Sequence, residues 1–157
     1  MKTRIAVLVL ALAWPAGLGA QEAVDSAGIT QAALDYIEGW YEGNSDRMTR
    51  ALHPDLVKRI VADRGGSSHI QGMTAEQLIG YTAGGGGRNT PAEKRRAEVT
   101  ILDVFGNAAS VRVDAAEWID YLQIGKVDGE WKILNVLWEF RPEVKAKMME
   151  RQKQAED

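Results

Sequence analysis

Asp120 is the residue in this sequence that is best suited to chemistry. It lies in a stretch where apolar and polar side chains alternate, and apolar surroundings make a carboxylate a stronger base. Such a carboxylate can remove a proton next to a carbonyl group, while Tyr36, Tyr81 or His53 polarises that carbonyl. One hypothesis is therefore isomerase, dehydratase or cyclase chemistry with Asp120 as the general base. The same side chains are also ordinary in a cavity that only binds a ligand.

The two histidines, His53 and His69, are the other groups that can exchange protons near neutral pH. His53 comes at the expected end of a helix, where it is either a pocket wall and proton donor or a residue that bonds the last backbone carbonyls. The spacing of the two matches no metal-ligand pattern, so we predict no metal site. The glycines at 84–87 lack the lysine and the strand-to-helix setting of a phosphate-binding loop. They indicate either a mobile loop beside a site or a surface linker.

The first twenty residues are typical of an export signal. The basic residues Lys2 and Arg4 precede an apolar run that ends at Trp14, and small residues follow up to Ala20. The apolar run is about half of the roughly twenty residues that a bilayer-spanning helix needs. We therefore predict a signal peptide at residues 1–20 that is cleaved off, and a periplasmic or secreted protein with no stable membrane anchor. A retained anchor is the alternative.

The composition narrows the function classes. The chain of 157 residues has no cysteine, which excludes disulfides, thiol catalysis and thiolate zinc sites. Its net charge is −3 and its basic residues are dispersed apart from those at 94–96, so we predict no nucleic-acid binding. Residues 21–142 have the length of one domain, and residues 143–157 form a charged tail. No residue set requires a cofactor, and none is predicted.

The hydrophobic periods predict an α+β domain. Apolar residues recur at helical spacing in the first half, and from Ala97 onward the period changes to two, as in antiparallel strands. Ser45 and Thr74 are the expected N-caps of the second and third helices. The expected elements are helices at about 27–42, 45–52 and 74–82, a small hairpin of 56–62 and 68–73, and an antiparallel meander from 97 to 140.

The dipeptide Asp128-Gly129 is the strongest turn signal in the chain and is typical of a two-residue type I′ turn. It fixes the register of the last hairpin, so that the numbers of facing residues sum to 257. One face then mixes apolar residues with Trp118, Asp120, Asn135 and Glu139. Because an unpaired buried carboxylate is costly, a cavity explains these residues better than a dry core does; a solvated rim is the alternative.

The other face of this hairpin presents a continuous apolar stripe, and exposed stripes of this size mark contact surfaces. We predict a homodimer through it, with cover by the C-terminal tail as the alternative. The predicted dimer face consists of Ile119, Tyr121, Leu134, Val136 and Trp138. The predicted pocket, which would hold a small apolar or aromatic molecule, consists of Tyr36, Trp40, His53, Tyr81, Trp118, Asp120, Asn135 and Glu139.

Five short strings in this order carry a family resemblance: 36–43 in the first helix, 51–54 after the second, 73–74, 120–122 and 126–133. Together they closely resemble the putative lumazine-binding family of the nuclear transport factor 2-like (SnoaL-like) superfamily. The resemblance implies a cone in which three N-terminal helices pack on a curved antiparallel sheet, with an interior cavity and frequent dimerisation through the sheet.

Members of that superfamily include ketosteroid isomerases, scytalone dehydratases, polyketide cyclases and many domains without catalysis. The fold therefore does not decide between an enzyme and a binding domain. From the sequence we expect an exported domain that binds a small ligand or has an accessory role, with an enzyme that uses Asp120 as the alternative.

Overall fold

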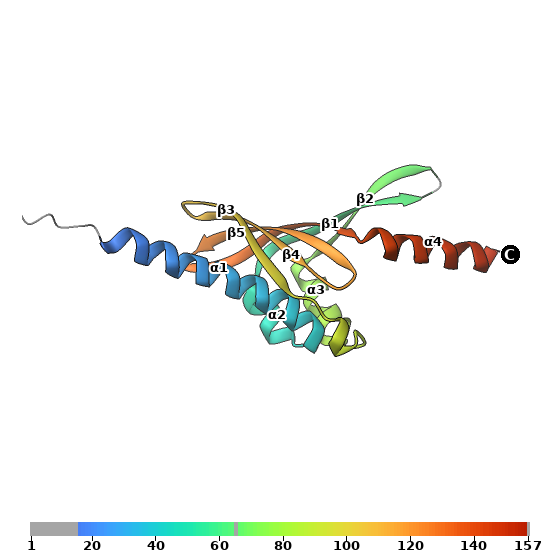
Figure 1. The fold of residues 1–157 in the computed structure, drawn as a ribbon, viewed down its shortest axis with the longest axis horizontal. Helices are drawn as coiled ribbons and strands as arrows, with labels where there is room; N and C mark the ends of the chain where they lie inside the picture. Colours follow the sequence, from blue (N-terminus) through green and yellow to red (C-terminus); the bar gives the residue numbers. More distant parts are fainter. Residues whose placement is uncertain (1–15, 65, 157) are drawn as a thin grey trace, which may run out of the picture.

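One curved sheet of six strands, with helices on one side of it, forms the body of the molecule (Figure 1). The computed structural model describes residues 16–64 and 66–156. The elements are α1 (Ala16–Glu42), α2 (Ser45–Ala51), β1 (Leu52–Arg64), β2 (Ser67–Thr74), α3 (Ala75–Ala83), η1 (Ala92–Lys94), β3 (Glu98–Phe105), β4 (Ala108–Asp114), β5 (Trp118–Val127), β6 (Glu130–Phe140) and α4 (Pro142–Glu156). Helices α1, α2 and α3 lie on the same side of the sheet, as the predicted cone requires.

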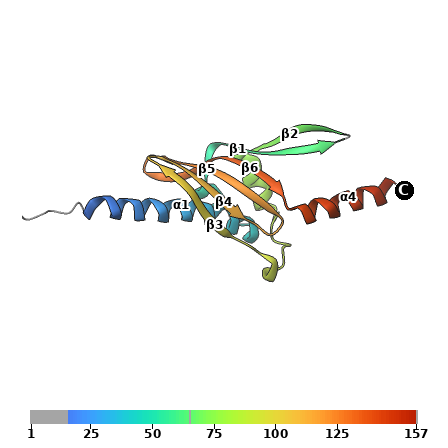
Figure 2. The ribbon, with the colours of Figure 1, turned by 45° about the horizontal axis from the view of Figure 1, so that its top comes forward.

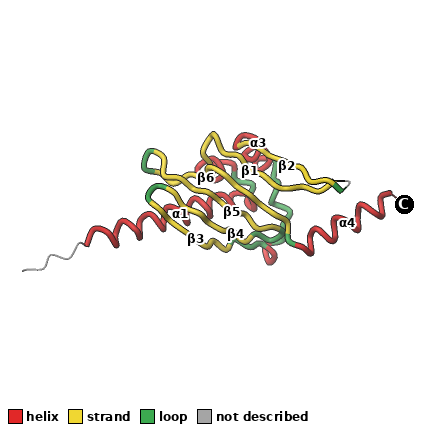
Figure 3. The backbone as a smooth tube through the Cα atoms, turned by 90° about the horizontal axis from the view of Figure 1, so that it is seen from above, coloured by secondary structure: helices red, strands yellow, loops and turns green. Residues whose placement is uncertain are grey.

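The strands follow the order β2-β1-β6-β5-β4-β3, which Figure 3 shows from above. Strands β3 to β6 form the predicted antiparallel meander. The small hairpin of β1 and β2 also joins the sheet, because β1 pairs with β6 in parallel, with Leu52 opposite Ile133. The sheet is therefore mixed and not wholly antiparallel as expected. The parallel pairing satisfies backbone groups on the edges of β1 and β6 that would otherwise need other partners.

Helix α1 is longer than the sequence predicts, because it begins at Ala16 instead of about residue 27. The predicted cleavage position after Ala20 lies within this helix, and residues 1–15 of the predicted signal peptide lie outside the described residues. In the part of the chain that the structure describes, no helix combines the length and apolar character needed to cross a membrane. At the other end of the chain the charged tail forms α4, which projects from the body in Figure 2.

The two short helices begin at side-chain caps. The N-cap of α2 is Asn44, whose side-chain oxygen accepts a hydrogen bond from the backbone N–H of Arg47, and the predicted cap Ser45 is instead the first helical residue. Both residue types cap helices well, so composition alone does not choose between neighbours. Thr74 caps α3 as predicted, and Gln77 completes the capping box by accepting from the backbone N–H of Thr74.

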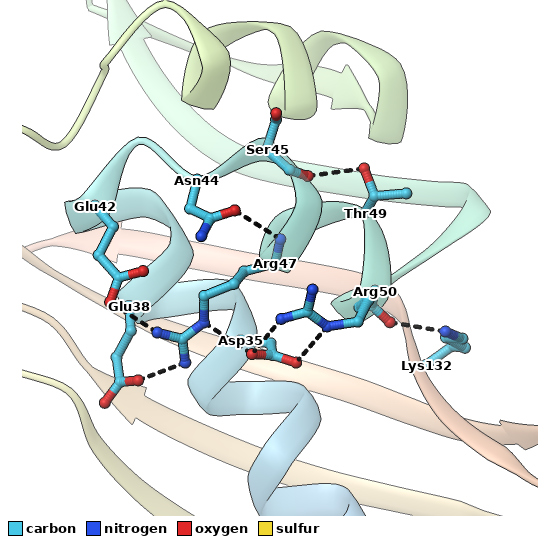
Figure 4. A network of polar contacts seen from close by, with 9 residues as sticks. All are labelled: Asp35, Glu38, Glu42, Asn44, Ser45, Arg47, Thr49, Arg50 and Lys132. Carbon is cyan, nitrogen blue, oxygen red and sulfur yellow. Dashed lines mark hydrogen bonds and ion pairs between the residues drawn. The ribbon is translucent and has the colours of Figure 1, made fainter.

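An ionic cluster joins α1 to α2 (Figure 4). The guanidinium of Arg47 donates to Asp35 at 2.8 Å and also binds the carboxylates of Glu38 and Glu42. Arg50 donates to the same Asp35 at 3.4 Å. Burial raises the pKa of Asp35, but the hydrogen bonds and charges of Arg47 and Arg50 outweigh it and hold that pKa below its usual value. The cluster therefore holds α2 against α1.

The register of the last hairpin changes part-way along it. The turn residues Asp128 and Gly129 both have positive φ, at 51° and 85°, as a type I′ turn requires. Near the turn Ile124 faces Ile133, which fits the predicted register, but further along Gln123 faces Asn135. One extra residue, Leu134, is therefore accommodated in β6 as a bulge.

Gly125 explains where this bulge lies. A β-carbon built on it would come within 2.7 Å of Cδ1 of Leu134, so the leucine side chain occupies the space that a larger residue would fill. Beyond the bulge the two sides of β6 are exchanged relative to the prediction. Val136 and Trp138 now lie on the helix side of the sheet, whereas Asn135, Leu137 and Glu139 do not. In β5 the prediction is confirmed, because Asp120 is buried and Tyr121 is exposed.

The core lies between α1, α2 and the helix side of the sheet. Each large apolar side chain buried there contributes roughly 1.5–3 kcal/mol to stability. The largest fully buried apolar residues are Ile29, Ile37, Met48, Leu56, Val111, Val113, Leu122, Ile124, Ile133 and Val136. At the end of the sheet away from the turn at 128–129, this core gives way to a cavity.

Candidate functional site

A cavity of about 230 Å³ opens between α1, α3 and the sheet. Its walls are almost entirely apolar or aromatic, and its polar side chains include a lysine and a tyrosine hydroxyl. The lining residues are Tyr36, Trp40, Met48, Lys58, Met73, Leu78, Tyr81, Glu117, Trp118, Trp138 and Phe140. Drug-sized ligands occupy clefts of roughly 300–1,000 Å³, so this cavity fits a molecule of one or two rings.

A buried polar cluster lies at one side of the cavity. The ammonium of Lys58 lies 2.6 Å from Oδ1 of Asp120, and the two side chains are 6% and 0% exposed. Trp118 donates its indole N–H to Oδ2 of Asp120 at 2.6 Å, and the hydroxyl of Tyr36 donates to the same oxygen at 3.1 Å. Lys58 also donates to the hydroxyl oxygen of Tyr36. The carboxylate of Asp120 is therefore held by three donors from α1, β1 and β5.

Aromatic rings surround the amine of this lysine. Its Nζ lies 4.8 Å from the ring centre of Trp138, 5.2 Å from that of Tyr36 and 5.7 Å from that of Trp118. Trp118 also meets Trp40 edge to face, with ring centres 6.2 Å apart. The faces of aromatic rings attract cations, and the rings exclude water from one side of the lysine.

Burial changes the pKa values of two groups in this cluster. It lowers the pKa of Lys58 because the ammonium has lost its hydration, although the charge of Asp120 opposes this effect. It raises the pKa of Tyr36 well above the usual value, and the nearby negative charge of Asp120 raises it further. Tyr36 is therefore a neutral hydrogen-bonding group at any physiological pH.

The structure brings five of the eight predicted pocket residues together. Tyr36, Trp40, Tyr81 and Trp118 line the cavity, and Asp120 lies behind its wall, bonded to two of the lining side chains. These residues come from α1, α3 and β5, and the sequence predicts the helical or strand state of each of them correctly.

His53 lies elsewhere. It belongs to β1 and not to a helix end, because β1 begins at Leu52, and its Nδ1 accepts a hydrogen bond from the backbone N–H of Asp55. It does not line the cavity, so neither the expected pocket role nor the expected helix-end role matches its position.

Asn135 and Glu139 are also displaced from the predicted pocket, in their case by the bulge at Leu134. Asn135 lines a groove on the opposite side of the sheet, together with Tyr121. Glu139 is exposed and forms an ion pair with Lys145 of α4 at 3.0 Å. The physical reason is the same for both, since one inserted residue turns each following side chain to the other side.

The bulge also changes the predicted dimer face. Val136 is buried in the core and Trp138 lines the cavity, so neither is available on the outer side of the sheet. Tyr121 and Leu137 face each other across β5 and β6 and are 47% and 55% exposed. They line a groove of about 500 Å³ that also includes Leu102 of β3. The expected homodimer stays a prediction. Ile119 and Leu134 of the predicted face are half-buried and Tyr121 is exposed, and Leu102 and Leu137 are further exposed apolar side chains beside them.

Sequence reasoning missed Lys58, the central residue of the cluster. The signal was present in β1, where Leu56, Lys58 and Ile60 occupy alternate positions and therefore point to the same side of the strand. Leu56 and Ile60 are buried, as an inward side requires. A lysine in the middle of an inward, apolar series needs a buried partner, and Asp120 provides it.

The glycines at 84–87 have a packing role beside this site. A β-carbon on Gly86 would overlap the indole ring of Trp40, and one on Gly87 would overlap both the ring and the backbone oxygen of Trp40. Backbone hydrogen bonds from Gly84 to Gly80 and from Gly86 to Tyr81 hold the segment against α3. The glycine segment at 84–87 thus lies directly behind Trp40, which forms one wall of the cavity.

No group of three or more histidines and carboxylates that could hold a metal ion occurs within residues 16–64 and 66–156. The polar side chains that line the cavity are Lys58, Tyr36, Tyr81 and Glu117; they include a single carboxylate and no histidine, and the amine of Lys58 is already paired with Asp120, so the set is unsuited to metal ligation. The cavity can instead hold an aromatic ring between its aromatic walls, and Lys58 can donate a hydrogen bond to a polar atom of that molecule.

A sequence profile described as "Putative lumazine-binding" matches residues 24–139. The chain belongs to the putative lumazine-binding family. The match covers every element of the sheet and most of α1, so the matched region contains both the cavity and the cluster behind it. No curated protein matches the chain significantly.

Solved structures that are similar to this chain include nuclear transport factor 2-like proteins. One of unknown function from Shewanella baltica is 21% identical, with a TM-score of 0.59 over 76% of this chain and 96% of that one. Another from Methylobacillus flagellatus is 24% identical, with a TM-score of 0.59 over 75% and 93%. A protein described as a putative scytalone dehydratase, from Novosphingobium aromaticivorans, is 14% identical, with a TM-score of 0.53 over 79% and 89%. At these identities the likeness shows the fold alone.

Proposed function

We propose that this protein binds a small planar aromatic molecule in the 230 Å³ cavity, with an uncharged hydrogen-bond acceptor of the ligand directed at Lys58. The observation that carries the proposal is the combination of aromatic walls with one buried amine. Rings pack well against Trp40, Trp118 and Trp138, and a single polar contact then fixes the orientation of the ligand.

The preference for an uncharged acceptor follows from charge balance. Asp120 already neutralises Lys58 at 2.6 Å. An anionic ligand would add a second negative charge near Asp120 in surroundings of low polarity, where like charges repel strongly. A ring carbonyl or phenol oxygen can accept a hydrogen bond from Lys58 without this penalty.

The cluster favours binding over catalysis by Asp120. A general base needs a free lone pair within reach of the substrate. The Asp120 carboxylate is fully buried behind the wall, and Lys58, Trp118 and Tyr36 all donate to it. The carboxylate oxygens of Asp120 already accept hydrogen bonds from the side chains around them and are not free to take a proton from a substrate. The isomerase, dehydratase or cyclase alternative therefore has less support than a binding role.

Calorimetric titration with three ring probes tests this function. The protein is unfolded and refolded first, so that any co-purified molecule is removed. We expect heat of binding from 2-naphthol and from lumazine, the bicyclic compound for which the family is named, and roughly tenfold weaker binding of the anion 2-naphthoate, equivalent to about 1.4 kcal/mol. Absence of binding by all three probes would contradict the proposal.

A matched pair of tryptophan variants locates the binding. Trp40→Leu removes a cavity wall and should weaken 2-naphthol binding. Trp131→Phe changes an indole that lies outside the cavity and bonds Asp25, so it should leave the affinity unchanged. Equal affinity of both variants and the unchanged protein would place the ligand elsewhere.

We also propose that residues 1–20 direct export and are then removed. The support is the basic start and the short apolar run of the sequence. Mass spectrometry of the protein from the periplasm or medium of a bacterial host should give a chain that begins at Gln21. An intact chain that is recovered only from the cytoplasm or the membrane would refute this.

A further inference from the structure

Lys58 is more than a hydrogen-bond donor, because it places a primary amine on the wall of a cavity suited to aromatic ligands. Primary amines react with aldehydes and ketones, and a buried lysine is the kind that proteins use for this reaction. The side chain is only 6% exposed, so a carbonyl compound can reach it only through the cavity.

We propose that Lys58 captures aromatic aldehydes or ketones as a reversible imine; this inference rests on the proposed function, since the cavity must first bind the ring. The Nζ lone pair forms a bond to the carbonyl carbon, and the carbonyl π electrons move to the oxygen, which takes up the proton that the newly bonded nitrogen releases. The resulting carbinolamine then loses its hydroxyl group as water while the carbon–nitrogen double bond forms.

The neighbours of Lys58 account for the protons of this sequence. Asp120, at 2.6 Å, accepts one proton from the ammonium and so frees the lone pair. Tyr36 lines the cavity and is hydrogen-bonded to both Lys58 and Asp120. Its hydroxyl relays the proton from Asp120, which lies behind the wall, to the hydroxyl group that leaves as water. The product is a protonated imine, so the positive charge opposite Asp120 is the same before and after the reaction.

Two features of the surroundings assist the reaction. The burial that lowers the pKa of Lys58 makes the free amine easier to form than on an exposed lysine. The rings of Trp118 and Trp138 beside Nζ limit the access of water, which would hydrolyse the imine. The same rings can stack on the aromatic part of the captured compound.

Reductive trapping tests this inference. The protein is incubated with 2-naphthaldehyde and sodium cyanoborohydride, which reduces the imine to a stable amine. We expect one label per chain, with the mass of the aldehyde less one oxygen atom, and peptide mapping should place it on Lys58. Exposed Lys94 and Lys147 are internal controls that should stay largely unlabelled. An excess of 2-naphthol should suppress the label because it fills the same cavity.

Lys58→Arg completes the test, since it keeps a cation beside Asp120 but has no amine that forms an imine; it should lose the label. Label on Lys94 and Lys147 with none on Lys58 would overturn the inference. If 2-naphthaldehyde displaces 2-naphthol in calorimetry but leaves Lys58 unlabelled, the imine is refuted and the binding function stands. If neither compound binds, both proposals fail together.

Discussion

The ammonium of Lys58 and the carboxylate of Asp120 are 2.6 Å apart, and both residues are buried. Removing one member of a buried pair leaves the other charge uncompensated, which typically destabilises a protein by about 3–5 kcal/mol. We therefore expect Lys58→Met to lower the free energy of unfolding in urea by about that amount. The double variant Lys58→Met/Asp120→Leu should lose less than Lys58→Met alone. A single variant as stable as the unchanged protein would show that the pair is unimportant for folding.

Asp35 should make stability depend on acid pH. Its pKa in the folded protein lies below the usual 3.8, because Arg47 and Arg50 outweigh the opposing effect of burial. The stabilisation is therefore complete above the usual value and is lost as the pH falls through the lower, folded value. Asp35→Asn should lower stability at pH 7 and reduce the loss of stability between neutral and acid pH. Urea unfolding at several pH values measures this, with exposed Glu150→Gln as the control; an unchanged pH dependence in Asp35→Asn would contradict it.

Gly86 should control the size of the cavity. A methyl group at this position overlaps the ring of Trp40, which must then shift. We expect Gly86→Ala to weaken 2-naphthol binding with a smaller effect on folding. Gly80→Ala is the matched control, because nothing lies within 4 Å of a β-carbon there and α3 gains roughly 0.5–1 kcal/mol from losing a helical glycine. If Gly86→Ala binds as tightly as Gly80→Ala, the packing against Trp40 does not shape the site.

Val136 and Leu137 test the bulge directly, since they are neighbours on opposite sides of β6. Val136 is 1% exposed and Leu137 is 55% exposed. Val136→Ala should cost about 2 kcal/mol of stability, whereas Leu137→Ala should change it by less than about 0.5 kcal/mol. Thermal or urea unfolding of the two variants decides the point, and the reverse order would restore the register expected from the sequence.

The outer groove around Tyr121 should mediate self-association if the predicted homodimer forms. Tyr121 and Leu137 are its exposed apolar residues in the centre of the sheet. Replacing both by glutamate places like charges on a two-fold interface and should convert a dimer into a monomer in sedimentation analysis. A protein that sediments as a monomer before any substitution would remove the dimer prediction.

Much of the fold follows from local signals in the sequence. Thr74 begins α3 as its capping pattern indicates, and Asp128 and Gly129 place the last turn. From that turn, alternation along β5 correctly puts Asp120 inside and Tyr121 outside. These features depend on residues close together in the chain, where turn and strand geometry leave few alternatives.

The rest of the site depends on contacts that local patterns do not encode. Gly125 is the one sequence sign of the bulge at Leu134, because a glycine inside a strand often marks a bulge. A regular register, which has no bulge, assigns Asn135 and Glu139 to the cavity and Val136 to the outer surface. Lys58 was missed for a related reason, since its partner Asp120 lies 62 positions away and on a strand that is not its neighbour.

The parallel pairing of Leu52 with Ile133 has a consequence for the order in which the molecule forms. Strand β1 leaves the ribosome early, but its inner neighbour β6 is nearly the last element made. Contacts between distant parts of a chain slow folding, because a long loop must close before they form. The cavity therefore takes shape only after β6 is made, and until then β1 has an unpaired edge, a feature that makes partly folded chains prone to aggregation.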